Sequence, residues 1–178
     1  MDRQPIVVNF LFGFYVFDLT VSKNGIQVSR FYTLMPMTLI DKFCALYSSL
    51  DVTTAEALTS IYTQDVEFID PISHHHGLNA VKTYFAALLE NTKDCTFHIS
   101  MIAPSALNED IDYTVTWTMH LVLKNKSAPI HLQGISILKV KNEKIYYHRD
   151  FYDLGEMVYE HIPVLGWVIH KIKARLHP

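Results

Sequence analysis

Apolar residues recur with two different spacings along the chain, and the change of spacing separates a helical part from a strand part. Between residues 38 and 91 they return every three or four positions, the repeat of an α-helix with one buried face. After Asn91 they alternate with polar residues, the repeat of a strand with one buried face. The pattern predicts helices at 38–50, 54–62 and 79–91, and strands at 65–70, 95–103, 110–124, 129–140 and 143–152.

Helices that precede a run of long strands are typical of the α+β class. The polar segments NKSAP and KNEK separate three of the strands by short turns, which predicts antiparallel hairpins. We therefore expect a curved antiparallel sheet with helices on its concave face, formed by residues 37–160. The chain of 178 residues is long enough to bury such a core as one domain.

The first 36 residues lie outside this pattern. The stretch PIVVNFLFGFYVFDL is as apolar as the centre of a signal peptide, but it contains Asp18 and no small-residue cleavage site follows it. From Met37 onward the chain has the features of a complete domain. Two interpretations of residues 1–36 stay open: an extension that begins at an upstream start codon, or an added edge strand or hairpin packed on the domain.

Residues 161–178 predict a separate, basic amphipathic helix. Its apolar stripe and its basic residues fall on opposite sides of a helical projection: Leu165, Val168, Ile169, Ile172 and Leu176 against His170, Lys171, Lys173 and Arg175. Such a helix can pack on its own domain or on a partner subunit, and it can also lie on an anionic membrane surface or dock on another partner. The sequence leaves these alternatives open.

Charge and cysteine content limit where the protein works and what it binds. The formal net charge is −3 with acids and bases interspersed, so no strong field attracts nucleic acid. Cys44 and Cys95 form no CxxC motif, which predicts free thiols in a reducing compartment and hence a cytoplasmic protein. No run of 18 apolar residues is present, as a membrane-spanning helix would need.

Three consecutive histidines in FIDPISHHHG raise the question of a metal site. They cannot all reach one ion from regular structure, although His74 and His76 can point the same way in an extended segment. Together with Asp70 they would form an improvised site of three ligands at best. We expect a variable loop between a strand and a helix, and no metal.

Two longer segments carry a family resemblance. VEFIDPxxxxxGxxAVxxYFxxL and GxSxLKVxxxKIxxHRDFYDLG resemble the nuclear transport factor two-like superfamily, and within it the SnoaL-like proteins, relatives of ketosteroid isomerase and polyketide cyclases. The resemblance covers residues 38–160. It implies a cone whose concave sheet face and helices enclose one apolar pocket, in a homodimer formed through the outer face of the sheet. Because this superfamily includes isomerases, cyclases, hydrolases and members without catalysis, it implies a fold and no single reaction.

The resemblance also implies candidate pocket residues. Asp70 matches the carboxylate that ketosteroid isomerases use as a general base, although an Asp before Pro at a strand end can equally hold a turn. The oxyanion donors of that isomerase are absent: its tyrosine aligns with Phe43, one helical turn before Tyr47, and its protonated aspartate aligns near Ser136. Steroid isomerisation is therefore not expected. Trp117 is expected in the pocket wall.

The last predicted strand adds polar residues that the isomerase lacks. Alternation along the strand places His148, Asp150 and Tyr152 on one face, which the family turns toward the cone. His148 and Asp150 form either an oriented acid/base pair or a structural pair that satisfies itself. One hypothesis is cofactor-free proton-transfer chemistry on a small, mostly apolar molecule, of the isomerase, cyclase or hydrolase type, with Asp70 or Asp150 as base and His148 and Tyr152 assisting. The alternative is a non-catalytic module for ligand binding or dimerisation.

Overall fold

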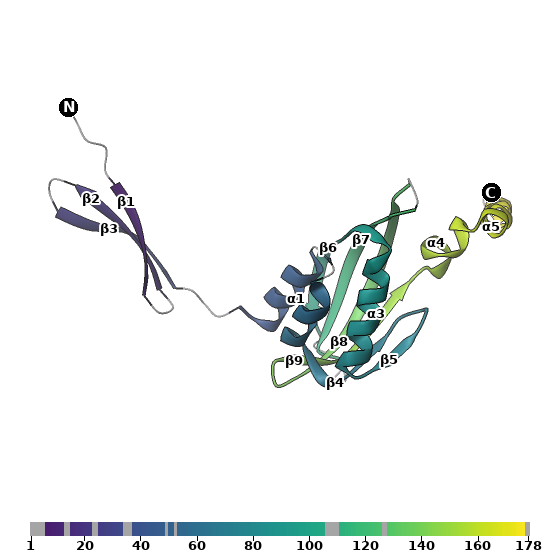
Figure 1. Ribbon diagram of the computed structural model, residues 1–178, viewed down its shortest axis with the longest axis horizontal. Helices are drawn as coiled ribbons and strands as arrows, with labels where there is room; N and C mark the ends of the chain where they lie inside the picture. Colours follow the sequence, from purple (N-terminus) through teal and green to yellow (C-terminus); the bar gives the residue numbers. More distant parts are fainter. Residues whose placement is uncertain are drawn as a thin grey trace, which may run out of the picture. The chain divides into compact units, whose positions relative to one another are not determined.

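The structure, a computed structural model, consists of two compact units, Met1–Thr38 and Leu39–Pro178 (Figure 1). It describes residues 6–12, 15–22, 25–33, 37–48, 50–51, 53–105, 111–125 and 128–176.

The first unit contains three strands, β1 (Ile6–Phe12), β2 (Tyr15–Ser22) and β3 (Gly25–Thr33). They pair in chain order as an antiparallel sheet, with a bulge in the β2–β3 pairing at Asp18. These strands thus pair with one another, and the strand order of the second unit's sheet does not include them. An origin of this segment in an upstream start codon stays a prediction.

The second unit has the helices and strands of an α+β domain. Its elements are α1 (Leu39–Tyr47), α2 (Thr54–Ala57), the 3₁₀ helix η1 (Leu58–Ser60), β4 (Tyr62–Ile69), β5 (His74–His76), α3 (Leu78–Glu90), β6 (Thr92–Pro104), β7 (Tyr113–Leu123), β8 (Ile130–Lys141), β9 (Lys144–Tyr152), α4 (Leu154–Met157), the 3₁₀ helix η2 (Tyr159–His161) and α5 (Pro163–Leu176). The predicted fold class is confirmed, and every element predicted between residues 38 and 152 is present with ends shifted by a few residues.

The six strands of this unit lie in the order β5-β4-β9-β8-β7-β6. The pairs follow the expected antiparallel pattern except for β4 and β9, which run parallel with Phe68 opposite His148. A long connection joins these two strands, so no tight turn dictates their direction as it does in a hairpin. The short strand β5 is also new: the histidine segment predicted to be a variable loop pairs with β4.

The core lies between the sheet and the helices α1 and α3, which cover one face of the sheet (Figure 1). Each helix contributes the apolar stripe seen in its sequence, with Phe43 and Tyr47 of α1 and Val81 and Phe85 of α3 almost completely buried. Alternate residues of the strands face them. Burying a large apolar side chain of this kind stabilises the fold by about 1.5–3 kcal/mol. The free thiols predicted for Cys44 and Cys95 are present.

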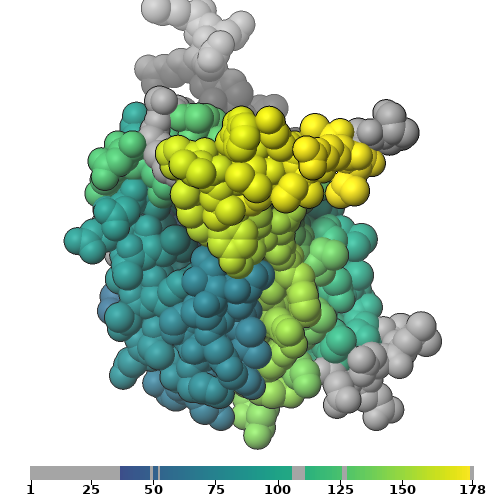
Figure 2. Space-filling model, turned by 90° about the vertical axis from the view of Figure 1, so that its right-hand side faces the viewer, coloured from purple at the N-terminus to yellow at the C-terminus, as the bar shows by residue number. Residues whose placement is uncertain are grey.

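The C-terminal segment forms the helix α5, and this helix lies at the surface (Figure 2). It contacts η2, and its Gly166 sits so close to the Glu160 carbonyl that a Cβ would clash there. Leu165, Val168 and Ile172 are 40%, 38% and 54% exposed, where packing of the stripe on its own domain would bury them. Docking of the stripe on a membrane or a partner stays a prediction. None of the described helices is long and apolar enough to cross a membrane.

We expect a variant that starts at Met37 to keep the thermal unfolding midpoint of the full chain. The strands β1 to β3 pair with one another, so their removal takes no backbone hydrogen bond from the six-stranded sheet. Circular dichroism melting curves of the two proteins test this. A midpoint lower by several degrees, the effect of a loss of about 1 kcal/mol in a domain of this size, would show that the domain depends on the segment.

Candidate functional site

A small cavity of about 50 Å³ lies inside the second unit, between the sheet, α3 and α4. Most of its lining is apolar, from Phe, Leu, Met and Trp side chains. Four polar residues also face it, Asp70, Tyr84, Asp150 and Tyr152. The structure thus brings Asp70 and Asp150, the two candidate bases, to one cavity, although they come from opposite ends of the domain sequence.

Asp150 is fixed by two donors on the sheet. Because β8 and β9 place Ser136 opposite Asp150, the serine hydroxyl donates to Oδ1 of the carboxylate at 2.5 Å. His148 lies two residues earlier on the same face of β9, and its Nε2 lies 2.8 Å from the same oxygen. Both of these bonds end on Oδ1. Within the described residues, Oδ2 therefore keeps lone pairs for a ligand.

A chain of buried hydroxyl groups continues from His148 away from the cavity. Its Nδ1 lies 2.5 Å from the Tyr62 hydroxyl, which in turn lies 2.7 Å from the Tyr47 hydroxyl. Burial is the main cause that raises the pKa of both tyrosines well above the usual value. Tyr62 and Asp150 raise the pKa of Tyr47 further, whereas for Tyr62 the hydrogen bond with Tyr47 opposes the increase and Asp150 adds to it. Both therefore remain protonated, and each hydroxyl can donate one hydrogen bond along this chain. At the other ring nitrogen of His148, Nε2–H donates to Asp150, because an ionised carboxylate only accepts.

The serine donor is oriented from its other side by Trp117. The indole Nε1–H donates to Ser136 Oγ at 2.8 Å, so the serine proton is directed at Asp150. Trp117 reaches this position because Gly134 on the neighbouring strand has no side chain. A Cβ at Gly134 would lie 2.2 Å from the indole ring. Every group in the network is thus linked, directly or through one or two others, to a single carboxylate.

Asp70 has a different role in the structure. Its Oδ1 accepts hydrogen bonds from the backbone amides of Ile72 and Ser73 at 2.8 and 2.7 Å, and more weakly from the Ser73 hydroxyl. Its Oδ2 accepts a hydrogen bond from the Tyr84 hydroxyl. With both oxygens engaged, Asp70 closes the turn between β4 and β5, which is the second of the two interpretations that the sequence left open.

The remaining candidate residues surround Asp150. The phenol of Tyr152 faces the cavity, and burial, with both carboxylates adding to it, raises its pKa, so it stays protonated and can donate to a ligand. Phe43 and Tyr47 line an adjoining small pocket with Trp117, Ser136 and Asp150. The predicted ligand-binding residues thus lie together around one carboxylate.

Sequence analysis missed three polar residues of this site: Tyr62, Tyr84 and Ser73. Tyr62 was placed only at the end of the predicted helix 54–62 and Tyr84 only within the predicted helix 79–91, because periodicity does not show which polar atom a side chain meets. The sequence held one signal for Tyr84. It is adjacent to Phe85 of the apolar stripe, and two adjacent residues can both face inward where the buried face of a helix is wide.

A family model described as a SnoaL-like domain matches residues 40–148. No curated protein sequence matches the chain.

Several solved structures share the fold. A protein with a ketosteroid isomerase-like fold from Catenulispora acidiphila, solved in complex with trimethylamine, is 16% identical with a TM-score of 0.58, covering 67% of this chain and 90% of its own. A putative SnoaL-like polyketide cyclase from Jannaschia sp. is 10% identical with a TM-score of 0.54, covering 65% and 85%. An LEH-like epoxide hydrolase from M. tuberculosis is 12% identical with a TM-score of 0.53, covering 67% and 83%. At these identities the likeness concerns the fold alone.

We expect Asp70→Ala to lower the free energy of unfolding by about 1–3 kcal/mol, because two partly buried backbone amides and the Tyr84 hydroxyl lose their acceptor. Urea denaturation measures the change. The control is Asp65→Ala on the exposed side of β4, which should change stability by less than about 0.5 kcal/mol. Equal stability of the two variants would contradict the turn-closing role.

Proposed function

Because the chain belongs to the SnoaL-like domain family, we propose that its cavity binds a small, mostly apolar molecule and that Asp150 exchanges a proton with it. The observation that carries this proposal is the network of donors that ends on one oxygen of Asp150 at the wall of an apolar cavity. A carboxylate buried among apolar side chains keeps its charge only with such partners. The network supplies them and leaves the second oxygen for a ligand.

The proposed chemistry follows from the groups around that oxygen. Asp150 Oδ2 takes a proton from a carbon or hydroxyl group of the ligand, and the protonated phenol of Tyr152 donates to the ligand oxygen on which negative charge develops. The proton then returns to another position of the ligand or to water. His148 and Ser136 are positioning residues in this scheme, since they hold the carboxylate and touch no ligand. Isomerisation, cyclisation and hydrolysis can all use this arrangement without a cofactor.

The size of the cavity limits the ligand. About 50 Å³ is well below the volume of roughly 300–1,000 Å³ typical of sites for drug-sized molecules. A polycyclic ligand would have to displace side chains, for example Met157 of the short helix α4. We therefore propose a ligand of a few heavy atoms, or a larger one that inserts a single group.

A second candidate function is binding without catalysis. It is favoured by the completeness of the network: His148 and Ser136 have partners for their polar atoms before any ligand arrives. Such a self-satisfied arrangement can orient a ligand, or only rigidify the domain, without moving a proton. In that case Asp150 only accepts a hydrogen bond from the ligand, and no proton is transferred.

We also propose that the domain forms a homodimer through the outer face of its sheet. Three large apolar side chains are exposed on that face: Met101, Ile135 and Phe151 are 50%, 43% and 43% accessible. Apolar groups gathered on one face mark an interaction surface, and a self-complementary patch gives a two-fold dimer.

Light scattering with size-exclusion chromatography tests the dimer. We expect the mass of two chains for the natural protein and of one chain for Ile135→Glu, because a charge in an apolar interface loses its water without gaining a partner. The control is Ala87→Glu, which adds the same charge at an exposed position of α3, the helix on the opposite face of the sheet. A natural protein with the mass of one chain would refute the proposal.

Asp150→Asn tests the role of the carboxylate. Asparagine keeps the shape and can accept the same two hydrogen bonds, and it removes a buried charge, so the free energy of unfolding should stay within about 1 kcal/mol. We expect the natural protein to exchange carbon-bound protons of small cyclic ketones with deuterium from the solvent, observed by proton NMR, and Asp150→Asn to lose this activity.

The matched control is Asp94→Asn on the exposed end of β6, which should behave as the natural protein does. Ketones that bind, as seen by saturation-transfer NMR, but exchange no protons would favour the binding module over the enzyme. Exchange that is equal in Asp150→Asn and the natural protein would exclude Asp150 as the base.

A further inference from the structure

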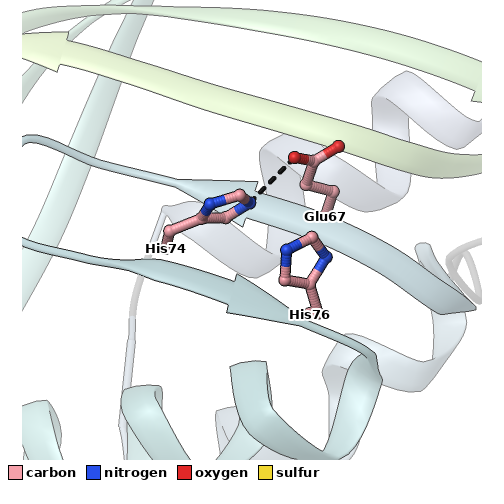
Figure 3. A group of neighbouring side chains, drawn as sticks. All are labelled: Glu67, His74 and His76. Atoms are coloured by element: carbon pink, nitrogen blue, oxygen red, sulfur yellow. Dashed lines mark ion pairs between the residues drawn. The ribbon is translucent and has the colours of Figure 1, made fainter.

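The pairing of β5 with β4 brings three potential metal ligands to one side of the sheet edge (Figure 3). Glu67 lies directly opposite His76, and His74 lies two residues from His76, so all three side chains project from the same face. This is the outer face, because Val66 and Phe68 on either side of Glu67 are buried in the core. The site is therefore separate from the cavity that holds Asp150.

The three side chains are close enough to share one ion. One ligand atom from each lies within 4.8 Å of the others, and within the described part of the chain this is the group of three that meets that distance. His74 Nε2 lies 2.8 Å from Glu67 Oε1, and the two imidazole rings are 4.2 Å apart. Ligand atoms around a tetrahedral zinc ion lie about 3.3 Å from one another, since each bond is about 2.0–2.1 Å long. Small side-chain rotations suffice to reach that arrangement.

From this geometry we propose that Glu67, His74 and His76 bind one divalent transition-metal ion, with Zn²⁺ as the best fit. Two imidazoles and one carboxylate are zinc ligands, and they leave a fourth position for water. Hard cations such as Mg²⁺ prefer sites made of oxygen alone. Sequence analysis expected no metal because it treated the histidines as a loop and considered Asp70 as the third ligand. Strand pairing supplies Glu67 instead.

The ion would act on the turn that Asp70 closes. His75 lies between the two ligands and projects to the opposite side of β5, where its ring stacks on Tyr84 with centroids 4.5 Å apart. Its Nε2 also bonds the Ser73 hydroxyl at 2.7 Å. Both Tyr84 and Ser73 donate to Asp70. An ion on the outer face therefore clamps β5 to β4 and steadies the turn at the cavity wall. This holds whether or not Asp150 catalyses a reaction.

Titration of the full chain with Zn²⁺ in a calorimeter tests the site. We expect one ion per chain, and an affinity reduced by at least about tenfold in each of His74→Ala, His76→Ala and Glu67→Gln. Loss of partners that only support a ligand already costs roughly 10–100-fold, and a direct ligand should cost no less. All three side chains are at least partly exposed, so the variants should fold. Mg²⁺ at the same concentration should not bind.

His120→Ala is the matched control. His120 also pairs with a carboxylate, that of Asp94 at 3.3 Å, and its ring lies 4.8 Å from a second imidazole, that of His131. We expect His120 to bind no zinc ion, so His120→Ala should leave the zinc affinity of the protein unchanged. Absence of stoichiometric binding by the natural protein, or equal loss of affinity in His120→Ala and His74→Ala, would overturn the proposal.

Hydrogen exchange tests the clamp separately. With Zn²⁺ bound, the backbone amides of Ile72 and Ser73 should exchange more slowly in the natural protein and at an unchanged rate in His76→Ala. Exchange that does not respond to Zn²⁺ in the natural protein would refute the clamp.

Discussion

A charged carboxylate inside an apolar cone has to be satisfied by the protein, and the arrangement around Asp150 shows what this requires. Ser136 and His148 donate to it, and Trp117 and Tyr62 orient these two donors from behind. The groups come from β4, β7, β8 and β9, and Tyr47 adds α1 through its bond to Tyr62. A network of this kind holds only when all of these elements are in register, because each buried polar group left without a partner is costly. The carboxylate thereby links the helical layer to the sheet.

The parallel pairing of β4 with β9 also helps to hold His148 in this network. It brings Phe68 opposite His148, whose ring lies edge-on to that phenylalanine with centroids 4.8 Å apart. The imidazole is therefore held by apolar contacts on its faces and by hydrogen bonds at both nitrogens, and it is almost completely buried. A histidine restrained in this way can keep one tautomer and hold a carboxylate in place. Its lack of access to solvent is the reason for assigning it a positioning role.

The sequence predicted what depends on local periodicity and missed what depends on contacts between distant segments. The strand repeat placed His148, Asp150 and Tyr152 on one face, and all three lie there. The same reasoning could not find Tyr62 as the partner of His148, since the two residues are 86 positions apart. Periodicity also does not show whether β4 and β9 run parallel or antiparallel. The segment His74–His76 was treated as a loop, since three residues are too few to show alternation. The family resemblance predicted the cone-shaped fold. It could not decide between the two interpretations of Asp70, because the turn-closing role depends on the backbone amides of the turn.

The hairpin of β4 and β5 shows how one short element serves both sides of the sheet. Alternation along β5 sends His75 inward to Tyr84 and Ser73, which hold Asp70, and sends His74 and His76 outward beside Glu67. Because three residues in a strand cannot move independently, any restraint on the outer pair is transmitted to the inner histidine. Asp70 matches the catalytic carboxylate of related isomerases in sequence, yet here it is engaged by the hairpin itself. The proton transfer that we propose is therefore assigned to Asp150, while Asp70 closes the turn between β4 and β5 at the wall of the same cavity.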